Sequence, residues 1–418
     1  MNYLAGLALS LSALTSTVVY ANSELFSVES EKRTTLLEPF QLSEYAVSVD
    51  LGHLGGTAKD SASEITLDLP EAGSIISVRT NAFVNASGSL SWVGNVEGDP
   101  GGSVILVNNK GIVHGSIRYA GRYFDLTTNS DNQQVLREID ENDPALQETL
   151  PTPVLAANLS NNSKDTRGLV PDDGSVIDLL VVYTPRAATT AGSVAAVEAR
   201  IDLGVTEANI SYANSDVDFT VNLVHKAQVD YVEGADVAID RDRLRIDGDG
   251  FLDEVHYMRD YYRADLVQMV AESNGCGIAY IMNPVSPDFE EFGFCVTDYV
   301  CVSPNYTFSH EMGHLQSARH DRSADSSHNA PFAFNHGYYD PDDQWRTVMS
   351  YRNCGGDPCT RTLYWSNPDI NHPINGNPTG IAGTDFDAAD NHLTLNTTRT
   401  TVANFRKSGD MLFVGNFD

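Results

Sequence analysis

The pattern of hydrophobic and polar residues divides the chain into a strand-rich first part and a mixed second part. In the first part, short runs of alternating apolar and polar residues are separated by glycine turns, which predicts β-strands. The segment concentrates no catalytic residue types, so its lone histidines, His53 and His114, are interpreted as solvated or structural. The predicted strands cover residues 65–70, 90–94, 103–107, 111–115 and 117–126.

Strand and helix patterns alternate in the second part. Apolar residues recur at helical spacing over residues 193–213, which predicts a helix with one buried side. A further helix is expected to begin near residues 305–307. This order predicts an α+β fold. The strands are predicted at residues 176–184, 219–224, 264–270 and 277–282.

An acidic segment precedes a second predicted helix. Residues 247–254 read DGDGFLDE, and the helix is expected to run to about residue 262. Asp249 is predicted to cap this helix. Calcium binding is the alternative, but the segment departs from the EF-hand pattern because Phe251 occupies the third ligand position. Ca²⁺ therefore stays an unsupported alternative cofactor.

The helix expected near residues 305–307 carries HEMGHLQSARH at residues 310–320. On a helix, His310 and His314 lie one turn apart on one face, so both imidazoles can reach one metal ion. Glu311 can reach water held by that ion without binding the metal. With 11 histidines and at most 57 glutamates in 418 residues, on the order of 10⁻³ chance matches are expected. The run predicts a catalytic zinc site with His320 as third ligand and a fourth position open.

The spacing of the third histidine constrains the backbone. A continuous helix would place His320 roughly 15 Å along the axis from His310, whereas each ligand must lie ~2.0–2.1 Å from the zinc. The chain must therefore leave the helix soon after His314 and fold back. The run resembles the extended zinc motif of the metzincin metallopeptidases, HExxHxxGxxH, which has glycine in place of Ser317. Because a non-glycine residue in a left-handed conformation costs ~1–2 kcal/mol, Ser317 either carries strain or makes the turn differently.

A second segment carries the same resemblance. Residues 345–351, WRTVMSY, resemble the methionine turn that lies beneath the metal in metzincins. A lone methionine is otherwise ordinary core packing. The resemblance implies that Met349 supports the zinc ligands without binding metal and that Tyr351 approaches the zinc or the reaction oxyanion. It also implies a zincin catalytic domain with the active-site helix beneath a twisted mixed sheet.

The resemblance narrows to bacterial peptidyl-Asp metallopeptidases, which are reprolysin-like metzincins, and spans roughly residues 176–406. It implies cleavage on the amino side of aspartate. That preference requires a cation in the pocket beyond the scissile bond, and Arg346 and Arg352 flank the methionine turn. Arginine can bind the carboxylate of a substrate through two parallel hydrogen bonds. The alternative is that both arginines form ion pairs with acidic residues on the protein surface. The similar runs lie at residues 177–185, 247–255, 276–280 and 365–368.

Composition limits the partners. The net charge is −31 at pH 7 and the sequence pI is about 4.5. Binding to nucleic acid requires a basic footprint, so nucleic acid is excluded as a partner, and anionic membranes are disfavoured for the same reason. An acidic surface suits the solubility of a secreted protein. The expected partners are protein or peptide substrates and the chain's own propeptide as inhibitor.

The five cysteines all lie in the second part of the chain and fit export, where disulfides persist. Cys354 and Cys359 bound a glycine-containing loop short enough for a disulfide. Cys276 with Cys301 is the preferred second pair, which leaves Cys295 free, and Cys295 with Cys301 is the alternative. The absence of CxxC pairs argues against a cysteine zinc finger.

Both ends of the first part suggest processing. Residues 4–19 are apolar or small and uncharged, and cleavage after Ala21 fits a signal peptide; a short membrane anchor, the alternative, needs ~20 apolar residues. Residues 151–171 are predicted to form a proline-containing linker, in which Lys164 and Arg167 are expected sites of proteolytic cleavage. A permanent accessory domain is the alternative to a propeptide. The predicted organisation is a signal peptide (1–21), a mostly β propeptide with processing linker (22–168), a catalytic domain (169–408) and a C-terminal tail (409–418).

The predicted function is a secreted zinc endopeptidase made as a zymogen, extracellular or periplasmic. His310, His314 and His320 hold Zn²⁺ as neutral imidazoles, and Glu311 is the general base toward the zinc-bound water. Tyr351 donates to the oxyanion. The alternatives are a zinc protease of broad specificity and a zinc-stabilised adhesin that no longer cleaves peptide bonds. The presence of Glu311 argues against the adhesin.

Overall fold

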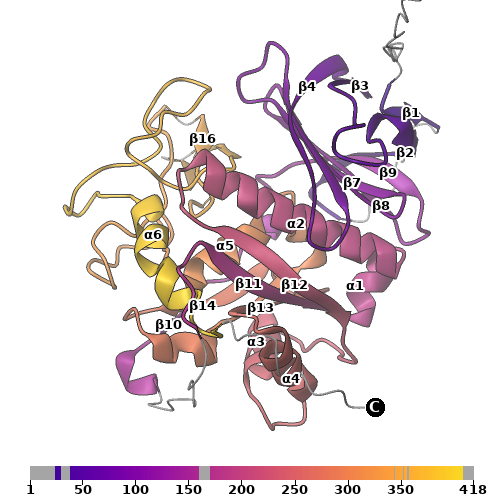
Figure 1. Ribbon diagram of the computed structural model, residues 1–418. Coiled ribbons are helices and arrows are strands. Elements are labelled where there is room, and N and C mark those ends of the chain that lie inside the picture. Colours follow the sequence, from indigo (N-terminus) through magenta and orange to yellow (C-terminus); the bar gives the residue numbers. More distant parts are fainter. Residues whose placement is uncertain are drawn as a thin grey trace, which may run out of the picture.

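Two large β-sheets, with helices between and around them, dominate the part of the chain that the computed structural model describes (Figure 1). The described residues are 24–29, 38–159, 170–342, 344–351, 353–354 and 357–407. Several sequence predictions lie outside these ranges: the signal peptide, Lys164 and Arg167, Arg352, and the C-terminal tail (409–418).

The first sheet has nine strands, and all neighbours in it are antiparallel. Its interior is formed by alternate residues, as in β3, where Ile65, Leu67 and Leu69 are buried. His114 is buried between Thr127 and Thr128, and burial lowers its pKa, so it is a neutral structural residue. The strands, in spatial order, are β1 (Phe26–Val28), β2 (Gln41–Val49), β9 (Gln134–Ile139), β8 (Arg122–Thr128), β7 (Ile112–Tyr119), β6 (Ser103–Asn109), β5 (Leu90–Val96), β4 (Gly73–Val84) and β3 (Glu64–Leu69).

The second sheet has six strands and mixed directions. All four strands predicted for this part are present. The linker predicted at residues 151–171 contains a further strand, β10, which pairs in parallel with β14. The sequence pattern does not predict this strand, because it is only three residues long and forms by pairing with the edge of β14. In spatial order the strands are β10 (Thr152–Val154), β14 (Gly277–Met282), β15 (Phe294–Asp298), β13 (Leu266–Ala271), β11 (Val176–Tyr183) and β12 (Thr220–Gln228).

Helices cover both faces of the six-stranded sheet, which confirms the α+β class. Leu179 and Val181 of β11 point into a core shared with α2, α5 and α6, whereas Leu180 and Val182 point toward α3 and α4. Burial on both faces explains why this strand is a continuous apolar run. The helices are α1 (Pro185–Thr190), α2 (Val194–Asn214), α3 (Val237–Arg245), α4 (Asp253–Tyr262), α5 (Thr307–Leu315) and α6 (Asn391–Val402).

The loop before α4 differs from its prediction. Asp249 accepts a hydrogen bond from the backbone of Phe251 and does not cap the helix. The helix begins at Asp253, whose carboxylate accepts from the backbone of Gly248 and Gly250 at 2.8 and 3.2 Å. The prediction that Asp249 caps α4 is therefore wrong: the carboxylate that holds this loop together is the one inside the first helical turn.

Short strands follow the histidine motif in sequence, after α5. β16 pairs in parallel with β19, and this register sets Arg346 beside Arg361. A second short pair, β17 with β18, spans the disulfide between Cys354 and Cys359. The bounds are β16 (Trp345–Arg346), β17 (Asn353–Cys354), β18 (Asp357–Pro358) and β19 (Thr360–Arg361).

The preferred disulfide pairing is confirmed. Cys276 bonds Cys301, Cys354 bonds Cys359, and Cys295 is free and buried. Among the described residues, no helix is both long and apolar enough to cross a bilayer.

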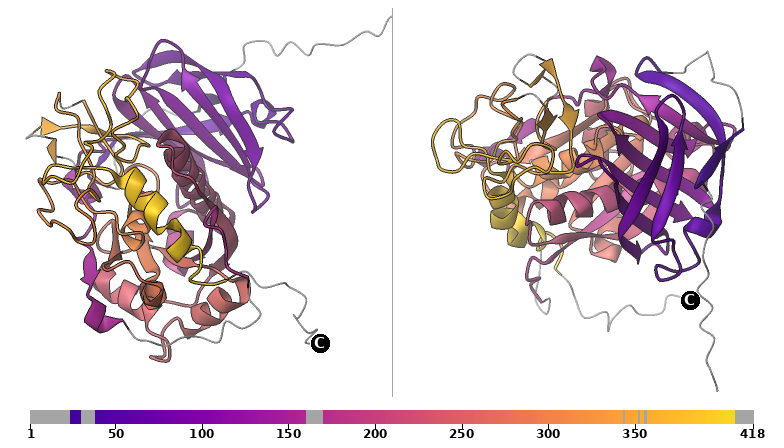
Figure 2. Two further views of the ribbon diagram at one scale, coloured as in Figure 1. Left: turned by 60° about the vertical axis from the view of Figure 1, so that its left-hand side comes forward. Right: turned by 90° about the horizontal axis from the view of Figure 1, so that it is seen from above.

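Helix α2 lies between the two sheets (Figures 1 and 2). Leu203 packs with Ile105 and Val107 of the nine-stranded sheet, while Ile201 and Val205 face the core of the six-stranded sheet.

Buried polar contacts also cross between the first sheet and the rest of the chain. Arg200 of α2 donates two hydrogen bonds to Asp125, at 2.6 and 2.7 Å. Arg118 donates to the hydroxyl of Tyr306 at 2.6 Å, just before α5. The nine-stranded sheet is therefore docked tightly against the elements that lead into α5.

Glu207 on α2 gives this interface a pH dependence. Burial raises its pKa to about 8, although Ser303 donates to its carboxyl at 2.7 Å. A carboxyl with a raised pKa holds its proton more tightly in the folded chain than in the unfolded chain, where the pKa of a glutamate is ~4.3. Its contribution to the free energy of unfolding is therefore largest below pH ~4.3 and falls as the pH rises toward 8. Glu207→Gln is expected to remove about 2–4 kcal/mol of the stability difference between pH 5 and pH 8. Denaturant unfolding of the full chain at both pH values measures this, and an unchanged difference would contradict it.

Candidate metal centre and active site

The turn after α5 brings the third histidine back to the first two. The helix ends at Leu315, soon after His314, as the spacing predicts. Ser317 adopts a φ of 74°, in the left-handed region. Its hydroxyl donates to the carbonyl of Met282 at 2.7 Å, and its own carbonyl accepts from Asn335 at 2.6 Å. Ser317 thus adopts the conformation that glycine favours, and two hydrogen bonds hold it there.

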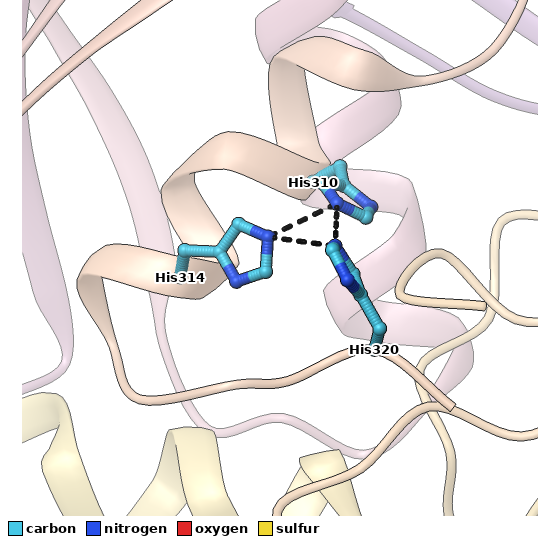
Figure 3. Close-up of side chains that lie close together, drawn as sticks. All are labelled: His310, His314 and His320. Carbon is cyan, nitrogen blue, oxygen red and sulfur yellow. Dashed lines mark hydrogen bonds between the residues drawn. The ribbon is translucent and has the colours of Figure 1, made fainter. Parts of the chain in front are cut away.

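The three histidines converge on one point (Figure 3). Each pair of Nε2 atoms among His310, His314 and His320 is 3.1 Å apart. Nδ1 of His310 lies 2.9 Å from the carbonyl of Val348, and Nδ1 of His314 lies 2.8 Å from that of Ala318. Because a carbonyl only accepts, these Nδ1 atoms carry the proton and the Nε2 lone pairs face one another.

The histidines are also held neutral. All three are buried, which lowers the pKa of His310 and His320 well below the usual range and that of His314 to about 4. Lone pairs that face one another without a hydrogen between them require a cation. Two nitrogens bound at ~2.0–2.1 Å to a tetrahedral ion lie about 3.3–3.4 Å apart, close to the observed spacing. The nitrogen donors suit a transition metal and not calcium, which takes oxygen ligands.

Glu311 lies beside this triad with a free carboxyl group. The residue is fully buried, and neither of its carboxyl oxygens has a hydrogen-bond partner among the described residues. Burial, followed by the charge of Glu148, raises the pKa of Glu311 well above 4.5. A carboxylate with a raised pKa is suited to take and return a proton near neutral pH.

Gly277, the first residue of β14, makes room for this carboxyl. A Cβ atom at Gly277 would lie 2.7 Å from Oε1 of Glu311 and 2.6 Å from Cγ2 of Thr307. Gly277→Ala is therefore expected to displace Glu311 and lower kcat/KM for peptide hydrolysis about 100-fold, since small misplacements of a reacting group have effects of this size. Gly293→Ala is the control, because its Cβ would meet Nη2 of Arg259 at 3.0 Å and two backbone carbonyls at 3.3 Å, and none of these groups belongs to Glu311 or the histidines. Equal activity of the two variants would contradict this role for Gly277.

The methionine turn lies under α5. Met349 is fully buried, and a Cβ at Gly313 would lie 2.9 Å from its sulfur. Gly313 therefore lets Met349 approach the helix between the first two histidines. Asp321 accepts from the backbone of Tyr351 at 2.8 Å and so links the end of the histidine motif to this turn. Asp321 therefore orients the backbone of this turn.

Tyr351 faces the triad. Its ring centroid lies 4.0 Å from that of His320. Its hydroxyl donates to the backbone carbonyl of Glu148 at 3.4 Å. Burial raises the pKa of this phenol far above neutral, so it remains a proton donor.

Sequence reasoning missed two charged residues at the site. Glu148, from the segment that follows the nine-stranded sheet, is fully buried, and its Oε1 lies 4.0 Å from Nδ1 of His310. Its carboxylate pairs with Arg361 of β19. Arg346 lies beside Arg361, but its guanidinium donates to Cys359 and Ser350 carbonyls and to Asn305. No local motif marks Glu148 or Arg361, because only the fold brings them to α5.

Comparison with known proteins places the chain among peptidases. Residues 173–366 match the family model described as metallo-peptidase family M12. A peptidyl-Asp metalloendopeptidase of Xanthomonas campestris pv. campestris is 33% identical over 407 residues, covering 91% of this chain and 90% of the relative. Two proteins of the same name from Stenotrophomonas maltophilia strains R551-3 and K279a are 35% and 37% identical, covering 81% and 74% of this chain and 78% and 72% of theirs.

These relatives, together with the buried histidine triad, define a metalloendopeptidase, a hydrolase of peptide bonds. The chain belongs to metallo-peptidase family M12.

Proposed function

We propose that the protein is a secreted zinc endopeptidase in which His310, His314 and His320 bind the metal. The observation that carries this proposal is the triangle of Nε2 atoms, 3.1 Å on each side, with the unpartnered carboxyl of Glu311 beside it. Three protein ligands leave one tetrahedral position open, which is the arrangement of a catalytic zinc.

The residues around the triad supply the rest of the chemistry. When bound, zinc lowers the pKa of water and polarises the carbonyl of the scissile bond. Glu311 takes the proton from the attacking water and returns it to the nitrogen of the leaving amine. Tyr351 donates from its hydroxyl to the developing oxyanion. Met349 holds α5 from below through its contact at Gly313.

We further propose that the enzyme cleaves on the amino side of aspartate. The relatives are named peptidyl-Asp metalloendopeptidases. A buried cationic group lies close to the triad: Arg346 has 1% of its surface exposed and is paired in register with Arg361. Arg352, the other sequence candidate, lies outside the described residues.

The N-terminal part is proposed to be an inhibitory propeptide behind a signal peptide. An exposed strand edge binds extended peptides through main-chain hydrogen bonds, and here β10 occupies that edge of β14. The backbone of Thr149 also donates to the carbonyl of Gly277 at 2.9 Å. A substrate could not use the same groups while this segment remains in place.

Casein hydrolysis with and without a chelator tests the proposal. Protein produced as the full chain, activated by cleavage and loaded with zinc is expected to digest casein, and the chelator is expected to abolish at least ~99% of the activity because the metal supplies several kcal/mol of transition-state stabilisation. A zinc-loaded, processed protein without activity would instead support the adhesin. Broad cleavage without preference for aspartate in a proteome digest would support the broad-specificity alternative.

A further inference from the structure

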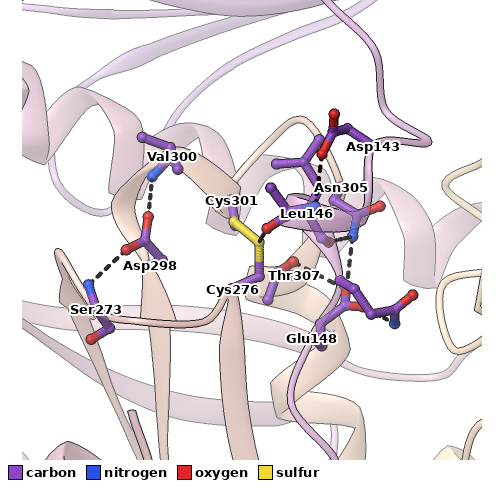
Figure 4. The surroundings of a disulfide bond; sticks show 12 residues. Asp143, Leu146, Glu148, Ser273, Cys276, Asp298, Val300, Cys301, Asn305 and Thr307 are labelled. Atoms are coloured by element: carbon purple, nitrogen blue, oxygen red, sulfur yellow. Dashed lines mark hydrogen bonds between the residues drawn. A yellow bond between two sulfur atoms is a disulfide. The ribbon is translucent and has the colours of Figure 1, made fainter. Parts of the chain in front are cut away.

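Glu148 lies with its carboxylate between Asn305 and Thr307, near the disulfide of Cys276 and Cys301 (Figure 4). Its Oε1 is also 4.0 Å from Nδ1 of His310. Its Oε1 accepts from the side-chain amide of Asn305 and from the hydroxyl of Thr307, both at 3.1 Å. Arg361 donates to both carboxylate oxygens, with Nη2 lying 3.3 Å from Oε2. Neither Glu148 nor Arg361 has any exposed side-chain surface. Three side chains from outside the segment of Glu148 therefore bind its carboxylate, and the neighbouring Gln147 also donates to it at 3.4 Å.

Glu148 is the carboxylate that offsets the charge of Arg361 in this pocket. Arg346 and Arg361 are neighbours, and burial and the adjacent guanidinium lower the pKa of Arg346. Of the nearby carboxylates, Glu141 is already paired with Arg118. A buried ion pair that loses one partner leaves an uncompensated charge, which is strongly unfavourable. Departure of the segment with Glu148 would therefore leave a buried cationic pocket that attracts another carboxylate.

The backbone of Glu148 also lies where a substrate residue would lie. Its carbonyl accepts from the hydroxyl of Tyr351, and the next residue bonds Gly277 at the start of β14. Glu148 thus combines two features of an acidic residue next to a scissile bond. It lies within reach of His310, and its side chain enters a pocket lined by arginine.

We propose that Arg361 is the residue that binds the acidic side chain of the substrate, and that Glu148 occupies this subsite in the uncut chain. The inference deepens the proposed function and rests on it. Arg361 supplies the paired hydrogen bonds that recognise a carboxylate, and Asn305 and Thr307 complete the set. Arg346 adds positive charge without bonding the carboxylate directly.

Matched peptides that carry Asp or Asn next to the scissile bond test this assignment. Arg361→Gln, produced as the full chain and then activated, is expected to lower the Asp-to-Asn ratio of kcat/KM about 100-fold. Arg361→Lys is expected to lower this ratio about tenfold, since a lysine keeps the charge but cannot form two parallel hydrogen bonds with a carboxylate. Because a general loss of activity lowers kcat/KM for both peptides equally, it leaves this ratio unchanged. Arg259→Gln is the control: this arginine is equally buried, but donates only to backbone carbonyls. An Arg361→Gln enzyme with the wild-type ratio would overturn the assignment.

A second arm needs no variant enzyme. A synthetic peptide of residues 143–155 is expected to inhibit the activated wild-type enzyme, and the same peptide with Glu148→Gln is expected to bind about 30- to 100-fold more weakly. Equal inhibition by both peptides would overturn the role of Glu148. The wild-type enzyme could hydrolyse Asp and Asn substrates equally while the Glu148→Gln peptide still inhibits more weakly than the unchanged peptide. That result would contradict the proposed preference for aspartate and would support the carboxylate-binding subsite.

Discussion

Replacing Glu311 with glutamine is expected to lower kcat/KM for peptide hydrolysis by about 10²- to 10⁴-fold, the range that a positioned general base contributes. The amide keeps the shape of the side chain and cannot take the proton from water. Since Glu311 makes no hydrogen bond among the described residues, the substitution breaks no contact that holds α5 in place. The histidines are untouched, so the variant is expected to retain one zinc per chain.

The comparison for this variant is Glu254→Gln, an exposed glutamate in the first turn of α4 on the opposite face of the sheet. Its rate is expected to match the wild type. Rates and zinc content should be measured on the same samples. A Glu311→Gln enzyme that keeps its zinc and hydrolyses peptides within threefold of the wild type would remove Glu311 from the mechanism.

Cutting the chain between its two parts is expected to raise peptidase activity about 10²- to 10⁴-fold. Glu148 is bound to Arg361 at the site, and breaking a buried pair of this kind costs roughly 3–5 kcal/mol. Each 1.4 kcal/mol is a tenfold change in binding, so the tethered segment should leave little free enzyme. Trypsin treatment of the full chain, which is expected to cut at Lys164 and Arg167, followed by a fluorogenic peptide assay, measures the gain.

A full chain with Lys164→Ala and Arg167→Ala provides the matched control, since trypsin then lacks these two cleavage sites. It is expected to stay at the low activity of the uncut protein. Full activity in this uncut variant would show that the N-terminal part does not inhibit, and would favour the permanent accessory domain.

The parts of the site that could be predicted from sequence are those encoded locally. The spacing of His310, His314 and His320 dictates both the helix and the turn that ends it, and the structure has both. Buried strands such as β11 and β14 appear as apolar runs because both of their faces are covered. The pairing of Cys354 with Cys359 also followed from the sequence, since the loop between them is short. For the second pair the sequence left Cys295 with Cys301 open as the alternative to Cys276 with Cys301, which the structure has.

The missed features depend on contacts between distant segments. Glu148 and Arg361 are ordinary charged residues in their own surroundings, and they become a pair only because β10 lies along β14 and β19 lies beside β16. Ser317 shows a related limit. The sequence predicts that Ser317 either carries strain or makes the turn differently, but the carbonyl of Met282 that accepts its hydrogen bond belongs to β14, far away in the sequence. Asp249 was misassigned because α4 begins later than its acidic loop suggests.

The most direct test of the central claim is anomalous X-ray scattering recorded on both sides of the zinc absorption edge from crystals of the full chain. The account predicts one strong zinc peak that lies ~2.0–2.1 Å from Nε2 of each of His310, His314 and His320. A zinc-loaded crystal with no peak there, or with His320 turned away from the ion, would contradict it.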